Sequence, residues 1–255
     1  MAKFVGNRSR SKEGPRHVTG KGLFTDDFTM PGMLQAMILR SPHAHAKILS
    51  VDSSEALNHP NVFAVITPDD VKTLTKPFKP GRYAAGLKRP IDEYAGAVDK
   101  VRYVGEPIGA VAAWDRGTAE DALELIQVDY EPLRPNVDVR EAIKPSSAVL
   151  FDELGSNLAW TGSLQYGDID AAFKSADRVV KENLKIHRYS STPLEPFNVI
   201  ASFDAASKRL TVWVTAQVPE VIYDGLREAL GLQDIRVIIP DVGGGFGQKI
   251  HLIRK

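Results

Sequence analysis

The chain has 255 residues, with 32 basic and 32 acidic side chains, 43% hydrophobic residues and no cysteine. This length is sufficient for two domains, while the charge balance provides no overall field that would attract nucleic acid or anionic lipid. The absence of cysteine excludes disulfides, zinc–thiolate sites and iron–sulfur centres built from this chain. No apolar stretch approaches the roughly 20 residues that cross a bilayer, so we expect no membrane insertion.

The N-terminal 18 residues are basic and polar, and they lack the apolar core of a secretory signal. We interpret them as an arm. A cytoplasmic location is the default expectation.

The region that follows the arm predicts short strands and helices in quick succession. Apolar runs between turn signals predict strands at residues 34–39, 46–51, 62–66, 108–114 and 128–130. Helical turns are expected at residues 53–57, from Pro68 onward, and at residues 118–126 with Thr118 as the N-cap. Residues 76–96 contain several prolines and little periodicity, which predicts a long loop. The succession indicates an α/β layer rather than an all-β barrel.

Residues 134–147 combine prolines and serines with charged residues, and they predict a domain boundary. After it we expect a helix at 168–176, a strand at 179–186, a hairpin of 199–203 with 210–215, and a helix at 222–230. Asp168 should cap the first helix, with Ala171, Ala172 and Phe173 facing inward. Gly231 should end the second helix.

An apolar strand at residues 237–239 leads into Gly243-Gly244-Gly245-Phe246-Gly247-Gln248-Lys249. Glycines permit positive φ and close approach of the backbone, so this loop is either moulded to a ligand or an ordinary turn. A dinucleotide fingerprint would need glycine where Gln248 stands, and a P-loop would need Ser or Thr where Ile250 stands. Neither standard nucleotide motif fits.

Three other positions are candidates on their chemistry. Gln217 follows a predicted strand and offers an amide donor and acceptor, although such a residue is more often a cap. Glu195 lies between Pro193 and Pro196, which stiffen the backbone, although a surface glutamate is the simpler interpretation.

His43 and His45 form a His-x-His pair without an evident third metal ligand. Packing in a turn or an interface is therefore favoured over a metal site, and no metal ligand is assigned.

The glycine loop resembles a signature of the molybdenum hydroxylases, the family of xanthine dehydrogenase, aldehyde oxidase and the aerobic carbon monoxide dehydrogenase large subunit. The resemblance extends, in the order of the family, through residues 19–27, 31–34, 40–48, 101–112, 119–122, 128–133, 193–196 and 215–217. It implies an α+β fold, with an a/b hammerhead domain followed by the start of a molybdenum-cofactor-binding domain. The expected division is an arm at 1–16, the hammerhead domain at 17–133, a linker at 134–147, and an incomplete molybdopterin-binding domain at 148–255.

The resemblance also implies the cofactor and the residues that bind it. The cofactor is molybdenum-molybdopterin, expected in its cytosine dinucleotide form. Gln217 matches a glutamine that hydrogen-bonds an oxygen ligand of molybdenum, and Gly244, Gly245, Phe246 and Gly247 match a segment that packs against the metal centre and its pterin. Glu195 is assigned only weakly to the substrate side.

No catalytic residue is nominated, because the family's active-site glutamate lies in a later segment. Ile250 stands where purine-oxidising relatives carry a substrate-orienting glutamate, which argues against xanthine-type specificity.

The implied activity is oxidative hydroxylation of an aldehyde or an electron-poor heterocycle, or a CO-type oxidation, with water as the oxygen source. Iron–sulfur and FAD centres are expected only in partner subunits or domains. The expected partners are an iron–sulfur small subunit, an FAD medium subunit and the remainder of the large subunit. The alternative is a truncated or split fragment without activity, serving as an assembly or interaction module.

Overall fold

The computed structural model describes residues 6, 8–78, 93–187 and 189–252. Within this part, the strands form three sheets of three strands each, with orders β1-β5-β3, β4-β2-β6 and β7-β8-β9. Most of the predicted loop at 76–96, and the first residues of the predicted arm, lie outside the described residues. None of the described helices is long and apolar enough to cross a membrane.

The first sheet is built around β5 (Pro107–Ala113), the apolar run that follows the Gly105-Glu106 turn. β1 (Gln35–Arg40) and β3 (Val62–Ile66) pair with it on either side, both antiparallel. Helix α4 (Arg116–Glu124) buries Ala119 and Ala122, and Ala122 joins Val111 of β5 in one apolar cluster. The helices α2 (Ser54–Asn58) and α3 (Pro68–Leu74) flank β3 along the chain.

The second sheet places β2 (Ala46–Asp52) between β4 (Lys100–Val101) and β6 (Gln127–Pro132). Its apolar side shares a cluster with the first sheet, because Ala46 and Val101 pack with Ile108 of β5. The two sheets therefore have a common core.

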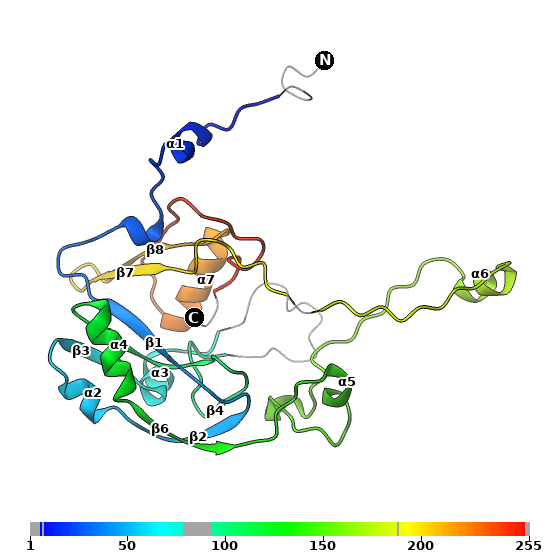
Figure 1. Cartoon of the computed structure of the whole chain (residues 1–255), viewed down its shortest axis with the longest axis horizontal. Coiled ribbons are helices and arrows are strands. Elements are labelled where there is room, and N and C mark those ends of the chain that lie inside the picture. The colour runs from blue at the N-terminus through cyan, green and yellow to red at the C-terminus, as the bar shows by residue number, and fades with distance from the viewer. Residues whose placement is uncertain (1–5, 7, 79–92, 188, 253–255) are drawn as a thin grey trace.

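The third sheet holds the predicted hairpin, β7 (Val199–Asp204) with β8 (Arg209–Val214). β9 (Ile235–Ile238) lies parallel to β8, and α7 (Pro219–Leu230) connects the two. Figure 1 shows α7 lying against this sheet, with β7 and β8 in yellow and orange. Gly231 ends α7 with φ +68°, as the sequence predicted. The core consists of Leu210, Val212, Val214, Ala216, Ile222 and Ile235.

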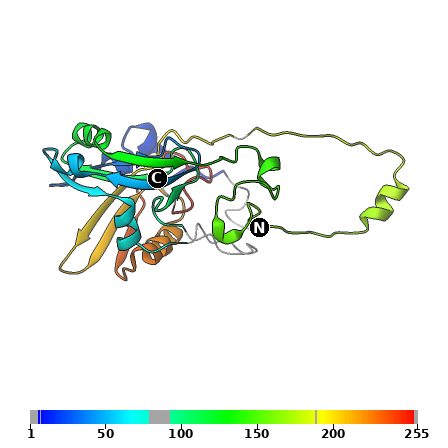
Figure 2. The ribbon, with the colours of Figure 1, turned by 90° about the horizontal axis from the view of Figure 1, so that it is seen from below.

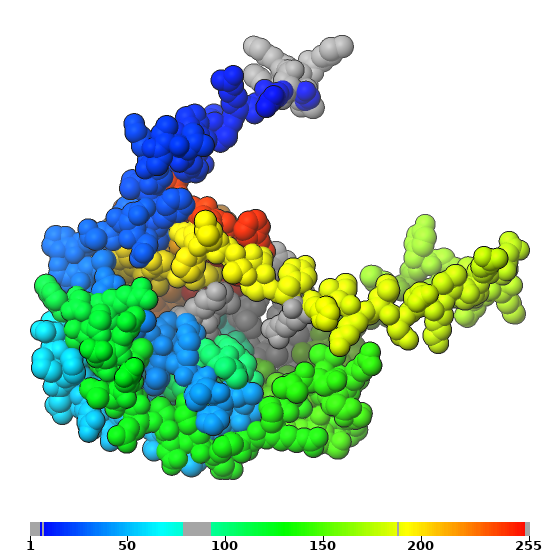
Figure 3. All heavy atoms as spheres, in the orientation of Figure 1, coloured from blue at the N-terminus to red at the C-terminus, as the bar shows by residue number. Residues whose placement is uncertain are grey.

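A projecting segment, residues 160–190, leaves the rest of the chain and returns to it, carrying α6 (Ile169–Ser175) near its far end (Figures 1 and 2). Every described residue of this segment is exposed. In the space-filling view the segment stands clear of the body (Figure 3). The shorter elements α5 (Val139–Ala142) and η2 (Asp152–Leu154) lie between β6 and the projecting segment.

Several sequence predictions are wrong in this structure. The expected strand at 179–186 is unpaired, because alternating residues form a strand only where another strand edge accepts their hydrogen bonds. Phe173, expected to face inward with Ala171 and Ala172, is 62% exposed, because no described element covers that face of α6. Asp168 does cap α6, accepting a hydrogen bond from the Ala171 amide at 2.9 Å.

The N-cap of α4 is Asp115 and not Thr118. The Asp115 carboxylate accepts from the Thr118 amide at 2.9 Å and from the Thr118 hydroxyl at 2.9 Å. Thr118 therefore lies in the first turn, and its hydroxyl supports the cap rather than forming it. These bonds lower the pKa of Asp115, with the bond from the Thr118 backbone contributing most.

Candidate cofactor-binding site

The glycine loop, residues 243–249, begins five residues after β9 ends and has an unusual backbone. Gly244 and Gly247 have φ values of +98° and +86°, and Phe246 has φ +49° although it is not a glycine. The Phe246 side chain is 72% exposed. Gly247 has no atom within 4 Å of an added Cβ, so its face of the loop is open. This is a shaped loop with an aromatic ring presented outward.

Gln217 fixes the inside of the loop. Its Oε1 accepts hydrogen bonds from the Gly247 amide at 3.0 Å and from the Lys249 amide at 3.3 Å. The backbone N–H of Gln217 donates to the Lys249 backbone carbonyl at 2.7 Å. Gly245 is buried against the same side chain, and an added Cβ there would lie 2.5 Å from the Gln217 Cδ. Gly245 is therefore glycine because Gln217 approaches it closely.

These hydrogen bonds also fix the positions of Oε1 and Nε2 in the Gln217 side chain. Two backbone N–H donors face Oε1, so the carbonyl oxygen must lie on that side. The Nε2 group remains, and within the described residues it donates no hydrogen bond, while the residue is exposed. Gln217 thus offers amide N–H donors outward from the loop.

Glu195 holds the two ends of the loop. Its Oε2 accepts from the Gly243 amide at 2.6 Å and from the Lys249 Nζ at 3.1 Å. The same ammonium group donates to the Glu195 backbone carbonyl at 2.8 Å. The Lys249 side chain is only 1% exposed. Thr215 contributes a hydroxyl 3.2 Å from Glu195 Oε1. Glu195 is thus a structural anchor of the loop.

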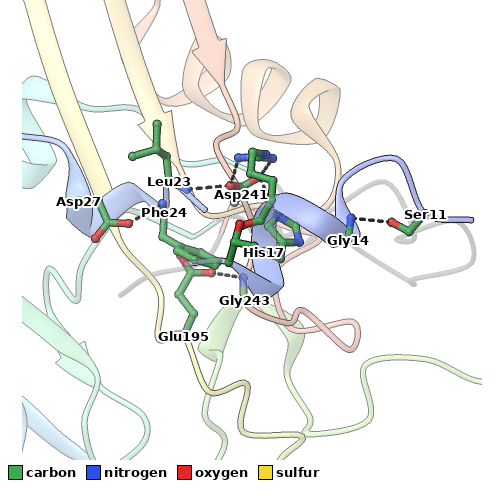
Figure 4. A network of polar contacts seen from close by, with 11 residues as sticks. Ser11, Gly14, His17, Leu23, Phe24, Asp27, Glu195, Asp241 and Gly243 are labelled. Atoms are coloured by element: carbon green, nitrogen blue, oxygen red, sulfur yellow. Dashed lines mark hydrogen bonds and ion pairs between the residues drawn. The ribbon is translucent and has the colours of Figure 1, made fainter. Parts of the chain in front are cut away.

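Asp241, two residues before the loop, is held by the N-terminal segment. Arg16 donates to both carboxylate oxygens, at 2.5 and 2.6 Å, and the Leu23 amide donates at 2.7 Å. His17 Nε2 lies 3.3 Å from Oδ1. Figure 4 shows Asp241 between Leu23 and His17, with Gly243 and Glu195 close by. The Arg16 hydrogen bonds, followed by the Leu23 amide, hold the pKa of Asp241 well below its usual range.

The other candidates lie elsewhere. The His45 ring is buried, with Nδ1 2.9 Å from the Arg134 carbonyl oxygen, and His43 packs edge-on against Tyr130. Across the described residues, no group of three or more His, Asp or Glu side chains is arranged to hold a metal ion. Ile250 is half-buried directly after Lys249.

Sequence reasoning missed Lys249 and Asp241 as parts of this site. In the sequence, Lys249 at the end of the glycine loop is considered only as part of a phosphate-binding P-loop motif. The partners of Asp241 are more than 200 residues away in the chain, so no spacing rule could find them.

Two family models cover most of the chain. Residues 19–134 match the aldehyde oxidase and xanthine dehydrogenase a/b hammerhead domain, and residues 150–254 match the molybdopterin cofactor-binding domain. The chain therefore belongs to the molybdenum hydroxylase family of xanthine dehydrogenase, aldehyde oxidase and the carbon monoxide dehydrogenase large chain, a family of oxidoreductases.

Individual relatives agree with this assignment. The carbon monoxide dehydrogenase large chain of Afipia carboxidovorans is 36% identical over 96% of this chain and 32% of its own length. The nicotine 6-hydroxylase large subunit of Paenarthrobacter nicotinovorans is 35% identical over 97% of this chain and 30% of its own length. Among solved structures, quinoline 2-oxidoreductase from Pseudomonas putida 86 superposes with a TM-score of 0.89 at 32% identity, covering 96% of this chain and 32% of that one.

The predicted order of a hammerhead domain followed by a molybdenum-cofactor-binding domain is thereby confirmed. The chain spans about a third of the length of the curated relatives it matches.

Proposed function

We propose that this chain contributes one side of the cofactor site of a molybdenum hydroxylase, through Gln217, Gly244, Gly245, Phe246 and Gly247. The observation that carries the proposal is that the two polar atoms of the Gln217 side chain have different roles. Its carbonyl oxygen holds the loop, and its amide N–H groups remain to donate to an oxygen atom of the cofactor.

The described residues fit a molybdopterin cofactor. An anionic, polar group needs hydrogen-bond donors and a backbone that it can approach closely. Gln217 Nε2 supplies donors, the open face at Gly247 permits approach, and the exposed Phe246 ring supplies an apolar surface. When bound, the molybdenum centre would supply the two-electron redox chemistry, and this chain would bind and orient it. We propose the cytosine dinucleotide form.

The proposed reaction is oxidative hydroxylation of an aldehyde or an electron-poor heterocycle, or a CO-type oxidation, with water as the oxygen source. Relatives named for nicotine, quinoline and carbon monoxide support this range. By the family resemblance, Ile250 occupies the position at which purine-oxidising members carry a glutamate. This supports a non-purine substrate. Glu195 is not proposed to touch substrate, because Gly243, Lys249 and Thr215 engage its carboxylate.

The proposed partners are an iron–sulfur small subunit, an FAD medium subunit and the remainder of the large subunit, with the complex in the cytoplasm. Relatives named as large chains or large subunits support a complex. The absence of cysteine supports this, because cysteine is the usual ligand of an iron–sulfur cluster and this chain has none.

The projecting segment supports the remainder of the large subunit as a partner, because large apolar side chains along the segment are exposed. They are Trp160, Leu164, Tyr166, Ile169, Phe173, Val179, Val180, Leu184, Ile186 and Tyr189.

The proposed division is an arm at 1–16, a hammerhead domain at 17–133, a linker at 134–147 and part of a molybdopterin-binding domain at 148–255. The limits of the two family models, at 134 and 150, support a boundary in this region. The alternative of a non-catalytic assembly module is not favoured, because the relatives are hydroxylases and dehydrogenases.

The test is a pair of substitutions at Gln217 in the assembled complex. Gln217→Glu keeps acceptor oxygens for the Gly247 and Lys249 amides but loses the amide donors, whereas Gln217→Ala loses both. We expect both variants to lose about 10²- to 10³-fold in kcat, as removal of one preorganised donor typically does. Only Gln217→Ala should also lower the melting temperature. Wild-type turnover in Gln217→Glu would contradict the donor role.

A further inference from the structure

The glycine loop is anchored at both ends, and the residues that hold its upstream anchor, Asp241, come from the N-terminal end of the chain. Asp241 lies two residues before Gly243, and its side chain is 11% exposed. The residues that satisfy its carboxylate, Arg16, His17 and Leu23, all lie in the first 23 residues.

Backbone pairing strengthens the same contact. The Asp241 amide donates to the Leu23 carbonyl at 3.0 Å, and Phe24 forms a parallel bridge with Asp241. Directly after Phe24, the buried Thr25 hydroxyl lies 3.1 Å from the Thr215 hydroxyl, which in turn lies 3.2 Å from the Glu195 carboxylate. The N-terminal segment thus touches both anchors of the glycine loop, Asp241 directly and Glu195 through Thr215.

We propose that residues 14–25 form a latch that positions the glycine loop, with Arg16 as the principal positioning residue. The latch fixes Asp241, and Asp241 fixes the backbone from which Gly243 enters the loop. This positioning is a property of the polypeptide itself. Its consequence for cofactor binding rests on the proposed function.

Arg16 suits this role for a geometric reason. Its guanidinium group donates to both oxygens of Asp241 in a bidentate arrangement, which fixes orientation as well as distance. A lysine would supply charge but only a single point of attachment. The short helix α1 (Gly14–Val18), which begins at Gly14 and Pro15, presents Arg16 and His17 together in its last turn. Arg16 and His17 lie outside the residues that match the family models.

Hydrogen exchange at the loop amides tests the latch. The amides of Gly243, Gly247, Gln248 and Lys249 are hydrogen-bonded within the site, so their exchange reports opening of the loop. We would measure them by NMR or mass spectrometry in the protein as isolated with everything that co-purifies. The variants are Arg16→Ala, Arg16→Lys and Asp241→Asn.

The matched control is Arg209→Ala. This substitution removes an arginine–carboxylate pair, Arg209 with Asp234, between the ends of β8 and β9 and outside the latch. We expect Arg16→Ala to speed exchange of the four loop amides by about tenfold, with α7 unchanged. Arg16→Lys should give an intermediate value. Asp241→Asn should match Arg16→Ala, and the double variant should be no worse than either, because each single substitution already breaks the same Arg16–Asp241 ion pair.

Unchanged loop exchange in Arg16→Ala, or the same change in Arg209→Ala, would overturn the proposal. Faster exchange confined to residues 14–25 would also overturn it, because the segment would then lie on the surface without positioning the loop. Molybdenum content is measured on the same samples. If the unsubstituted chain, assembled with all its partners, holds none, the proposed function fails while the exchange result still decides the latch.

Discussion

The ion pair between Lys249 and Glu195 joins the end of the glycine loop to the segment before β7. Its side chains are 1% and 13% exposed. Withdrawing two charges from water is costly, and only their mutual contact and further hydrogen bonds offset that cost. Removal of one partner therefore leaves the other without its compensation.

We expect Lys249→Met to lower the free energy of unfolding by roughly 3–5 kcal/mol, the usual effect of breaking a buried pair. Urea denaturation of the protein in its assembled form measures it. Lys47→Met is the matched control, because Lys47 pairs with Glu131 at the surface, where side chains are 53% and 48% exposed. That substitution should cost no more than about 1 kcal/mol. Equal losses in the two variants would show that burial of Lys249 has no energetic consequence.

The roles of single residues were only partly predictable from the sequence. The glycine cluster correctly indicated a loop with close approach and positive φ, because glycine is needed for both. The sequence did not show that the group approaching Gly245 is Gln217, or that Glu195 anchors the loop. Those contacts join residues that only the fold brings together. The cofactor roles of Gln217, Gly244, Gly245, Phe246 and Gly247 stay predictions.

At the level of elements, β5 is the strand on which the first sheet depends. It lies between β1 and β3, and at Gly109 the backbone of the neighbouring strand β3 comes very close. A Cβ added to Gly109 would lie 2.4 Å from the Ile66 carbonyl oxygen. Since that oxygen belongs to the backbone, β3 would have to move.

We expect Gly109→Ala to lower the melting temperature strongly, with a loss of roughly 1–3 kcal/mol, as overpacking a core typically costs. Gly117→Ala in α4 is the control. There the added Cβ would meet only the Asp115 side chain at 3.4 Å, and alanine favours a helix by about 0.5–1 kcal/mol. Calorimetry of both variants checks the difference. A Gly109→Ala protein as stable as wild type would contradict the close packing of β3 on β5.

Local patterns predicted most elements but not all. The strand at Val62–Ile66 has the predicted limits, and Gly231 ends α7 as expected, because apolar runs and a positive-φ stop are local signals. β4 was missed, since a two-residue strand carries no periodicity. The false strand at 179–186 has the right alternation but no partner, and pairing is not a local property.

At the level of the whole molecule, the projecting segment is the main part of the described chain that no other described element packs against. It is exposed throughout its described residues and carries large apolar side chains. Water contact with such a segment is unfavourable, so we propose that further polypeptide of the large subunit lies against it.

Limited proteolysis with trypsin compares the isolated 255-residue chain with the assembled complex. We expect early cuts at Lys174, Arg178, Lys181 or Lys185 in the isolated chain and roughly tenfold slower cuts in the complex. Lys208, in the exposed turn between β7 and β8, is the internal control and should be cut similarly in both. Equal cutting of the projecting segment in both states would contradict its burial in the complex.

The central claim is that this chain forms one side of a molybdenum-cofactor site, and metal analysis tests it most directly. The complex would be purified from a host that synthesises the cofactor, and its molybdenum and released pterin would be quantified per chain. We expect about one molybdenum and one pterin per chain in the complex, since one loop serves one cofactor. We expect neither molybdenum nor pterin in the isolated 255-residue chain. A complex that contains this chain, has all its partners and yet holds no molybdenum would contradict the account.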